Sequence, residues 1–153
     1  MKNTRIRSRL TGPIVALVIL GLVGFAWAAK PGTFRATGTA TFVSQDASGK
    51  HFVFTHVGHS NPGGNFTGGV VGHTNATFEK QSGTLTLDYG GGNTLTIDTK
   101  LQAQSDGSLV GPYVVTGGTG IYANATGGGT QIVFAPNADG TRDFSLEGTL
   151  STQ

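Results

Sequence analysis

The chain has 153 residues, of which 26 are glycine, none is cysteine and 12% are charged. This length suits one domain with one hydrophobic core, and the lack of cysteine excludes a disulfide framework. The formal charge of +2 arises at the N-terminus, because four of the ten Lys and Arg residues and none of the eight Asp and Glu residues precede residue 30. Residues 30–153 therefore carry a charge of −2, which argues against a nucleic-acid partner.

The first residues follow the order of a secretory signal peptide. Basic residues at positions 2, 5, 7 and 9 precede an apolar run from Ile14 to Trp27, and the small residues Ala28 and Ala29 follow. The run is shorter than the roughly 20 residues of a membrane-spanning helix. We therefore expect a signal helix at residues 1–29, cleaved after Ala28 or Ala29. Residues 30–153 would then form a single secreted or periplasmic domain with no membrane attachment.

From Thr33 onward, apolar and polar residues alternate with period two, and no stretch has the spacing of a substantial helix. Short strands separated by Gly, Asn, Asp and Ser predict an all-β domain. We expect an eight-stranded antiparallel β-barrel, with a sandwich as the alternative because alternation alone does not close a sheet. The predicted strands are Phe34–Phe42, His51–Val57, Val70–Phe78, Thr84–Tyr89, Thr94–Ala103, Leu109–Thr116, Thr130–Phe134 and Arg142–Leu150.

The sequence of the fourth and fifth strands predicts which of their residues pair. A three-residue loop at 90–92, made of three glycines, places Leu87 opposite Leu95 and Leu85 opposite Ile97. All four leucine and isoleucine side chains then face inward. Glycine suits a turn that requires positive φ.

A meander of eight strands would collect the glycine-rich segments 58–69, 90–92 and 117–129 at one rim, here named the Gly-rich rim. The turns around Asp46, Lys80, Asp106 and Asp139 would lie at the opposite rim. We expect the Gly-rich rim to be the mouth through which a ligand enters. The alternative is that both rims consist of plain turns.

Three side chains are candidates for catalysis. His56 and Tyr89 face inward near the Gly-rich rim, and Tyr113 lies deeper, so together they would offer a proton donor and acceptor. The alternative is that they cap the core and hydrogen-bond one another. The expected ligand-binding residues are apolar and face inward: Phe52, Phe54, Leu85, Leu87, Leu95, Ile97 and Phe144.

The segment from Leu109 to Gly129 carries a resemblance to a known family. A strand leads into Thr116-Gly-Gly-Thr-Gly120, followed by Tyr122, Ala125 and Gly127. This resembles the signature of the allene oxide cyclase and dirigent barrels, and the residues at 131–134 and 144–150 are similar to the last two strands of an allene oxide cyclase. The resemblance implies a calycin-type barrel, a homo-oligomer such as a trimer and, for an enzyme, a cyclase or isomerase without metal or cofactor. The acidic, asparagine and cysteine residues associated with plant cyclase chemistry have no counterparts here.

The remaining patterns argue against metal or hydrolytic chemistry. His51, His56, His59 and His73 fall within one hairpin region, but parity places His56 inward and His73 outward and no carboxylates cluster nearby, so we expect no metal. The nucleophile motifs of hydrolases are absent. We expect a secreted barrel that binds a small hydrophobic molecule, as a carrier or as a template for a cyclisation. The alternative is a non-catalytic envelope protein with a solid barrel core.

Overall fold

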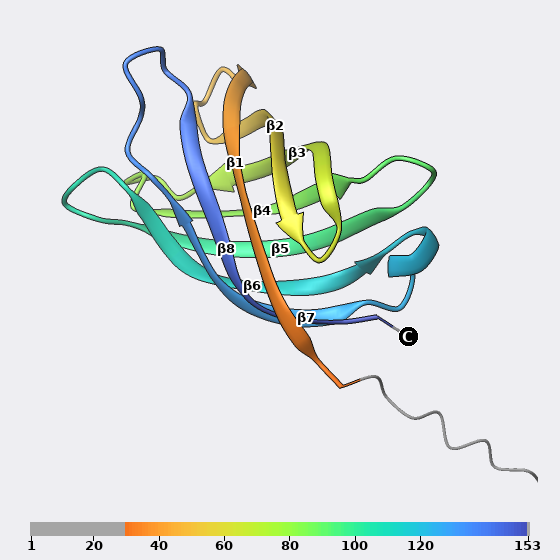
Figure 1. Cartoon of the computed structure of the whole chain (residues 1–153). Helices are drawn as coiled ribbons and strands as arrows, with labels where there is room; N and C mark the ends of the chain where they lie inside the picture. The colour runs from red at the N-terminus through yellow and green to blue at the C-terminus, as the bar shows by residue number, and fades with distance from the viewer. Residues whose placement is uncertain (1–29, 153) are drawn as a thin grey trace, which may run out of the picture.

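The computed structural model describes residues 30–152, so the predicted signal helix at residues 1–29 lies outside the described residues. Eight antiparallel strands pair in chain order, and the last pairs with the first, so the sheet closes (Figure 1). This confirms the eight-stranded barrel and excludes the sandwich. The elements are β1 (Gly32–Gln45), β2 (His51–Asn61), β3 (Gly64–Thr74), β4 (Lys80–Asp88), β5 (Thr94–Ala103), β6 (Leu109–Gly118), a 3₁₀ turn η1 (Gly120–Tyr122), β7 (Thr126–Val133) and β8 (Arg142–Ser151).

The strands are tilted in the barrel because their register is staggered. Following opposed residues from Phe42 on β1 through all eight strands leads back to Gly32, ten residues earlier on the same strand. Such a stagger sets the tilt and the diameter of a small barrel. Among residues 30–152 no helix has the length and hydropathy to cross a bilayer.

The β4–β5 hairpin has the predicted register. Leu85 lies opposite Ile97 and Leu87 opposite Leu95, and all four side chains are at most 1% exposed. The glycines at 90–92 adopt φ of +79°, +62° and +81°, a conformation that costs other residues free energy. The alternation of apolar residues and the three glycines of the turn were therefore sufficient to predict the register of this hairpin.

Two predicted loops are largely strand. β2 continues to Asn61 and β3 begins at Gly64, so most of segment 58–69 is paired, and β7 begins at Thr126 and includes three of the glycines assigned to segment 117–129. At its other end β3 stops at Thr74, before the predicted Phe78. The two loop boundaries were wrong because a run rich in glycine shows no alternation of side chains even when its backbone is extended. β3 ends early because residues 75–78 form a turn, in which the Phe78 N–H donates to the Asn75 carbonyl and Phe78 adopts φ of 60°.

Glycines on the inner surface make room for aromatic rings. A Cβ on Gly72 would lie 2.6 Å from Cζ of Phe52, and one on Gly38 would lie 2.9 Å from Cε1 of Phe144. Each ring therefore lies across the neighbouring strand at a position where a larger residue would displace it. Gly58 makes the same kind of contact with the ring of Phe66. Each of these three glycines lies directly opposite its aromatic partner, and two further aromatic residues also lie opposite a glycine, in the pairs Phe34–Gly148 and Tyr113–Gly129.

Candidate functional site

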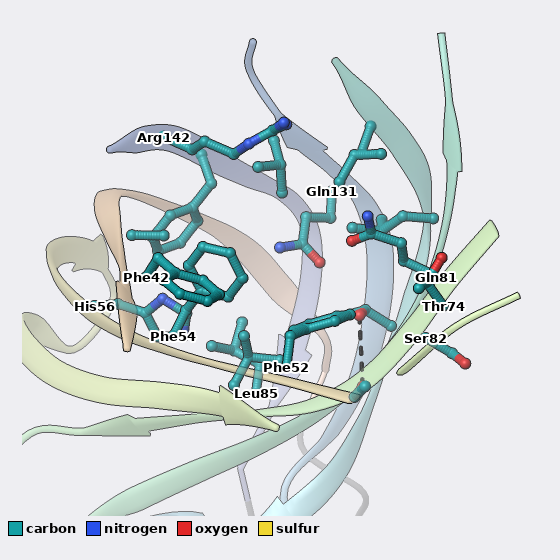
Figure 2. Close-up of a pocket in the computed structure, with 18 of the residues that line it drawn as sticks. Phe42, Phe52, Phe54, His56, Thr74, Gln81, Ser82, Leu85, Gln131 and Arg142 are labelled. Atoms are coloured by element: carbon teal, nitrogen blue, oxygen red, sulfur yellow. Dashed lines mark hydrogen bonds between the residues drawn. The ribbon is translucent and has the colours of Figure 1, made fainter. Parts of the chain in front are cut away.

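A cavity of about 180 Å³ occupies one half of the barrel (Figure 2). It is lined by the last inward residues of the odd-numbered strands and the first inward residues of the even-numbered strands. It therefore opens at the rim formed by the connections 46–50, 75–79, 104–108 and 134–141, here named the turn rim. The apolar lining is Ala40, Phe42, Phe52, Phe54, Val70, Phe78, Leu85, Leu101, Leu109, Val133 and Phe144.

The Gly-rich rim is closed, so the prediction of a mouth there was wrong. Tyr122 of η1 packs against Tyr89 with ring centroids 5.1 Å apart, and Phe66 packs against Tyr89 at 5.9 Å. The hydroxyls of Tyr89 and Ser60 are 2.9 Å apart, and Ser60 Oγ donates to the carbonyl of Pro62. The short turn after β2 brings these groups together, and the rings fill the end of the barrel.

The predicted ligand-binding residues divide between the two halves of the barrel. Phe52, Phe54, Leu85 and Phe144 line the pocket. The others, Leu87, Leu95 and Ile97, are fully buried in the core of the closed half and do not reach the pocket.

The three predicted catalytic residues do not form one site. His56 lines the pocket, whereas Tyr89 belongs to the closed rim, where burial raises its pKa to about 12. Tyr113 is buried, and its hydroxyl lies so close to Gly148 that a Cβ added there would be 2.7 Å from the oxygen. Burial raises the pKa of Tyr113 to about 12 as well. The predicted pairing of a proton donor with an acceptor is therefore not present.

His56 is the buried titratable side chain of the pocket. It is 6% exposed, and its ring packs edge-on against Phe144 with centroids 5.3 Å apart. Burial lowers the pKa of His56 to about 4, against a smaller opposing effect of the Gly69 backbone, so the imidazole is neutral at pH 7. Neither ring nitrogen makes a well-formed hydrogen bond within residues 30–152.

Gln131 on β7 is a second buried polar residue of the pocket, and sequence reasoning missed it. Its side chain is 7% exposed and extends from β7 into the pocket (Figure 2). Oε1 of Gln131 has no hydrogen-bond partner among the described residues. The sequence could have indicated it, because Gln131 is two residues from Val133 on the same strand and therefore faces the same side, and Val133 also lines the pocket.

The mouth carries one cation and two half-exposed aromatic rings. Arg142 donates from one guanidinium nitrogen to the carbonyls of Gly107 and Phe134, and partial burial lowers its pKa. Phe42 and Phe78 are 50% and 52% exposed and line the opening. Phe78 has φ of 60°, and its ring reaches toward the turn that contains Gly49. The β3–β4 turn thus holds an aromatic ring at the mouth in a backbone conformation that is costly for a bulky residue.

The pocket offers binding groups rather than a general acid–base pair. Among its described lining residues there is no carboxylate, and the ionisable ones are His56 and Arg142. The other three histidines lie on the outside of the barrel. The ring centroids of His51 and His73 are 6.2 Å apart, and Nδ1 of His59 is 3.0 Å from Oδ1 of Asn65. Within residues 30–152 no three His, Asp or Glu side chains gather at a spacing that would hold a metal ion.

Comparison of the chain with protein-family models, curated proteins and solved structures finds no match. The resemblance to the allene oxide cyclase and dirigent barrels therefore stays a prediction that rests on the residues from Leu109 onward.

Proposed function

We propose that this protein is an exported binding protein that holds a small hydrophobic molecule in the pocket at the turn rim. The observation that carries the proposal is an apolar cavity that is open to solvent at one end and closed at the other. Pockets for small molecules are concave, mostly apolar and furnished with a few convergent polar groups. The pocket supports this function over that of an envelope protein with a solid core.

Membership of the allene oxide cyclase and dirigent barrels is part of the proposal, supported by the Gly-rich corner at 116–120 and the aromatic Tyr122 that plugs it. A template for a cyclisation needs only to restrain the shape of its substrate, which an apolar pocket does. Proton transfer in this pocket would depend on His56, because Tyr89 and Tyr113 lie outside it.

The proposal is tested by filling the pocket from one strand. Val70 on β3 lines the cavity, whereas the next residue, Val71, points outward and is 66% exposed. We expect Val70→Phe to weaken binding of the neutral fluorescent probe N-phenyl-1-naphthylamine about tenfold or more, because the added ring occupies the probe's volume.

Val71→Phe is the matched control, and we expect it to bind the probe as the wild type does. Fluorescence titration measures both affinities, and circular dichroism verifies that both variants remain folded. Equal probe affinity in Val70→Phe and the wild type would show that binding occurs elsewhere, and absence of binding to the wild type would refute the proposal.

A further inference from the structure

The inner end of the pocket is polar, although its walls are apolar. On β2 the lining residues are Phe52, Phe54 and His56, and His56 is the farthest of them from the turn rim; on β7, Gln131 is likewise farther from that rim than Val133. These two residues, His56 and Gln131, are here named the polar floor. Each is more than nine-tenths buried, and neither has its hydrogen-bonding capacity met within the described part of the chain.

Burial of polar side chains without protein partners is costly for folding. Buried polar side chains nearly always find a partner, and leaving one without a partner loses the hydrogen bond that it makes with water in the unfolded chain. Replacing both residues by apolar ones of similar size would remove this cost. The arrangement is therefore explained best by a ligand that supplies the missing partners.

The chemistry of the floor determines which polar group fits. Oε1 of Gln131 can only accept a hydrogen bond, so it requires a donor. A neutral imidazole at position 56 offers one N–H donor and one acceptor nitrogen. A hydroxyl, which both donates and accepts, can satisfy both residues.

Other ligand classes fit the floor less well. A hydrocarbon would leave His56 and Gln131 unpaired. A carboxylate offers no donor to Gln131, and the cation that lines the pocket, Arg142, is the first inward residue of β8 and so lies at the mouth rather than at the floor. A buried anion without a countercharge is strongly disfavoured.

We propose that the pocket selects a neutral apolar molecule that enters with a hydroxyl group first, the hydroxyl donating to Oε1 of Gln131 and accepting from the ring N–H of His56. The apolar body of the ligand then lies between the aromatic walls, and its far end reaches the mouth beside Phe42 and Phe78. This inference rests on the proposed binding function and adds the class and orientation of the ligand.

Three probes of one shape test the proposal on the wild-type protein: 2-naphthol, 2-methylnaphthalene and 2-naphthoate, titrated by isothermal calorimetry at pH 7. We expect 2-naphthol to bind about tenfold or more tightly than 2-methylnaphthalene, and 2-naphthoate to bind weakest. Equal affinity for 2-naphthol and 2-methylnaphthalene would overturn the hydroxyl preference and leave the proposed function intact. This is the result expected if water alone is the partner of the polar floor. Tightest binding of 2-naphthoate would also overturn it, in favour of a carboxylate held at Arg142. Failure of all three probes to bind would refute the binding function itself.

Substitutions locate the preference at the floor. We expect His56→Phe and Gln131→Met each to lower affinity for 2-naphthol about tenfold while preserving or improving affinity for 2-methylnaphthalene. Gln81→Met, which changes the same side chain on β4 nearer the turn rim, should retain the wild-type preference. Both floor variants should melt at a higher temperature than the wild type in the absence of ligand. A lower melting temperature would mean that the two residues serve the core, and would contradict the proposal.

Discussion

His56 places a group that ordinarily titrates near neutral pH inside an apolar pocket. Burial lowers its pKa from 6.5 to about 4 in the folded protein, whereas the unfolded chain keeps the ordinary value. Between these two pH values the unfolded state binds more protons than the folded state, so the free energy of unfolding falls as the pH falls. Below pH 4 the folded protein also takes up the proton, and this loss ends.

His56→Phe should remove this pH dependence. Between pH 7 and pH 4.5 we expect the wild type to lose about 2 kcal/mol of unfolding free energy from this residue, and the variant to lose little of that amount. The pKa values of Asp46, Asp106 and Asp139 are lowered from 3.8 by their hydrogen bonds, so their stabilisation is lost only at a lower pH and does not obscure the measurement.

Urea unfolding monitored by circular dichroism at both pH values measures the difference. His73→Gln is the control, because this side chain lies on the outer surface beside Ser82, and it should keep the wild-type pH dependence. A His56→Phe protein that loses as much stability as the wild type would contradict the burial argument.

Glycines within strands determine how the barrel elements pack. Gly58 on β2 lies directly opposite Phe66 on β3, and a Cβ there would overlap the Phe66 ring and the carbonyl oxygen of Thr37. Because backbone or packed rings lie on both sides, the site cannot relax by moving one flexible side chain.

Gly58→Ala should therefore destabilise the barrel by about 3 kcal/mol, as overpacking does in a close-packed core. Gly32→Ala on β1 is the matched control: the nearest atom to its Cβ would be the carbonyl oxygen of Leu150 at 3.9 Å, and we expect a change within about 1 kcal/mol. Urea denaturation of both variants measures the effect. A Gly58→Ala barrel as stable as the wild type would show that the strands shift to accommodate the methyl group.

The same glycines explain how far the sequence could predict the fold. Where apolar side chains alternate, as at Leu85 and Leu87, parity and the glycine turn were enough to give the hairpin register. Where glycine replaces the alternating side chains, as around Gly68, an extended strand has the composition of a loop. The aromatic–glycine pairs become visible only when both strands are placed, because the partners of a pair lie far apart in sequence.

The candidate site was predicted only in part, for a related reason. Parity identified His56, Phe52 and Phe54 as inward residues, and all three line the pocket. Parity does not say which end of a barrel is blocked. That depends on the contact of Tyr89 with Tyr122 from another connection, and this contact closed the rim that was expected to be the mouth.

At the scale of the whole molecule, the barrel is packed at one end and open at the other. Fully buried leucines, isoleucine and aromatic rings fill the half beside the Gly-rich rim, and this core continues into the pocket wall through Leu85 and Phe144. The half beside the turn rim retains a cavity and an unpaired polar floor. Substitutions at the pocket residues that lie outside the buried core, such as Phe42 and Phe78, should therefore affect folding less than substitutions at Leu85 or Phe144, which serve both the core and the pocket.

Export would deliver this barrel without its N-terminal basic residues and without Trp27, the single tryptophan of the chain. Expression of the full chain in a Gram-negative bacterium should yield a periplasmic or secreted product that begins at Ala29 or Lys30, because a signal peptidase cleaves after small residues. Mass spectrometry identifies the first residue, and the emission spectrum should be that of tyrosine alone. Replacing Ala28 and Ala29 together by leucine should leave an uncleaved precursor that keeps tryptophan emission. A wild-type product that begins at Met1 would show that the segment stays attached, and the chain would then keep the four additional positive charges and the apolar run that precede residue 30.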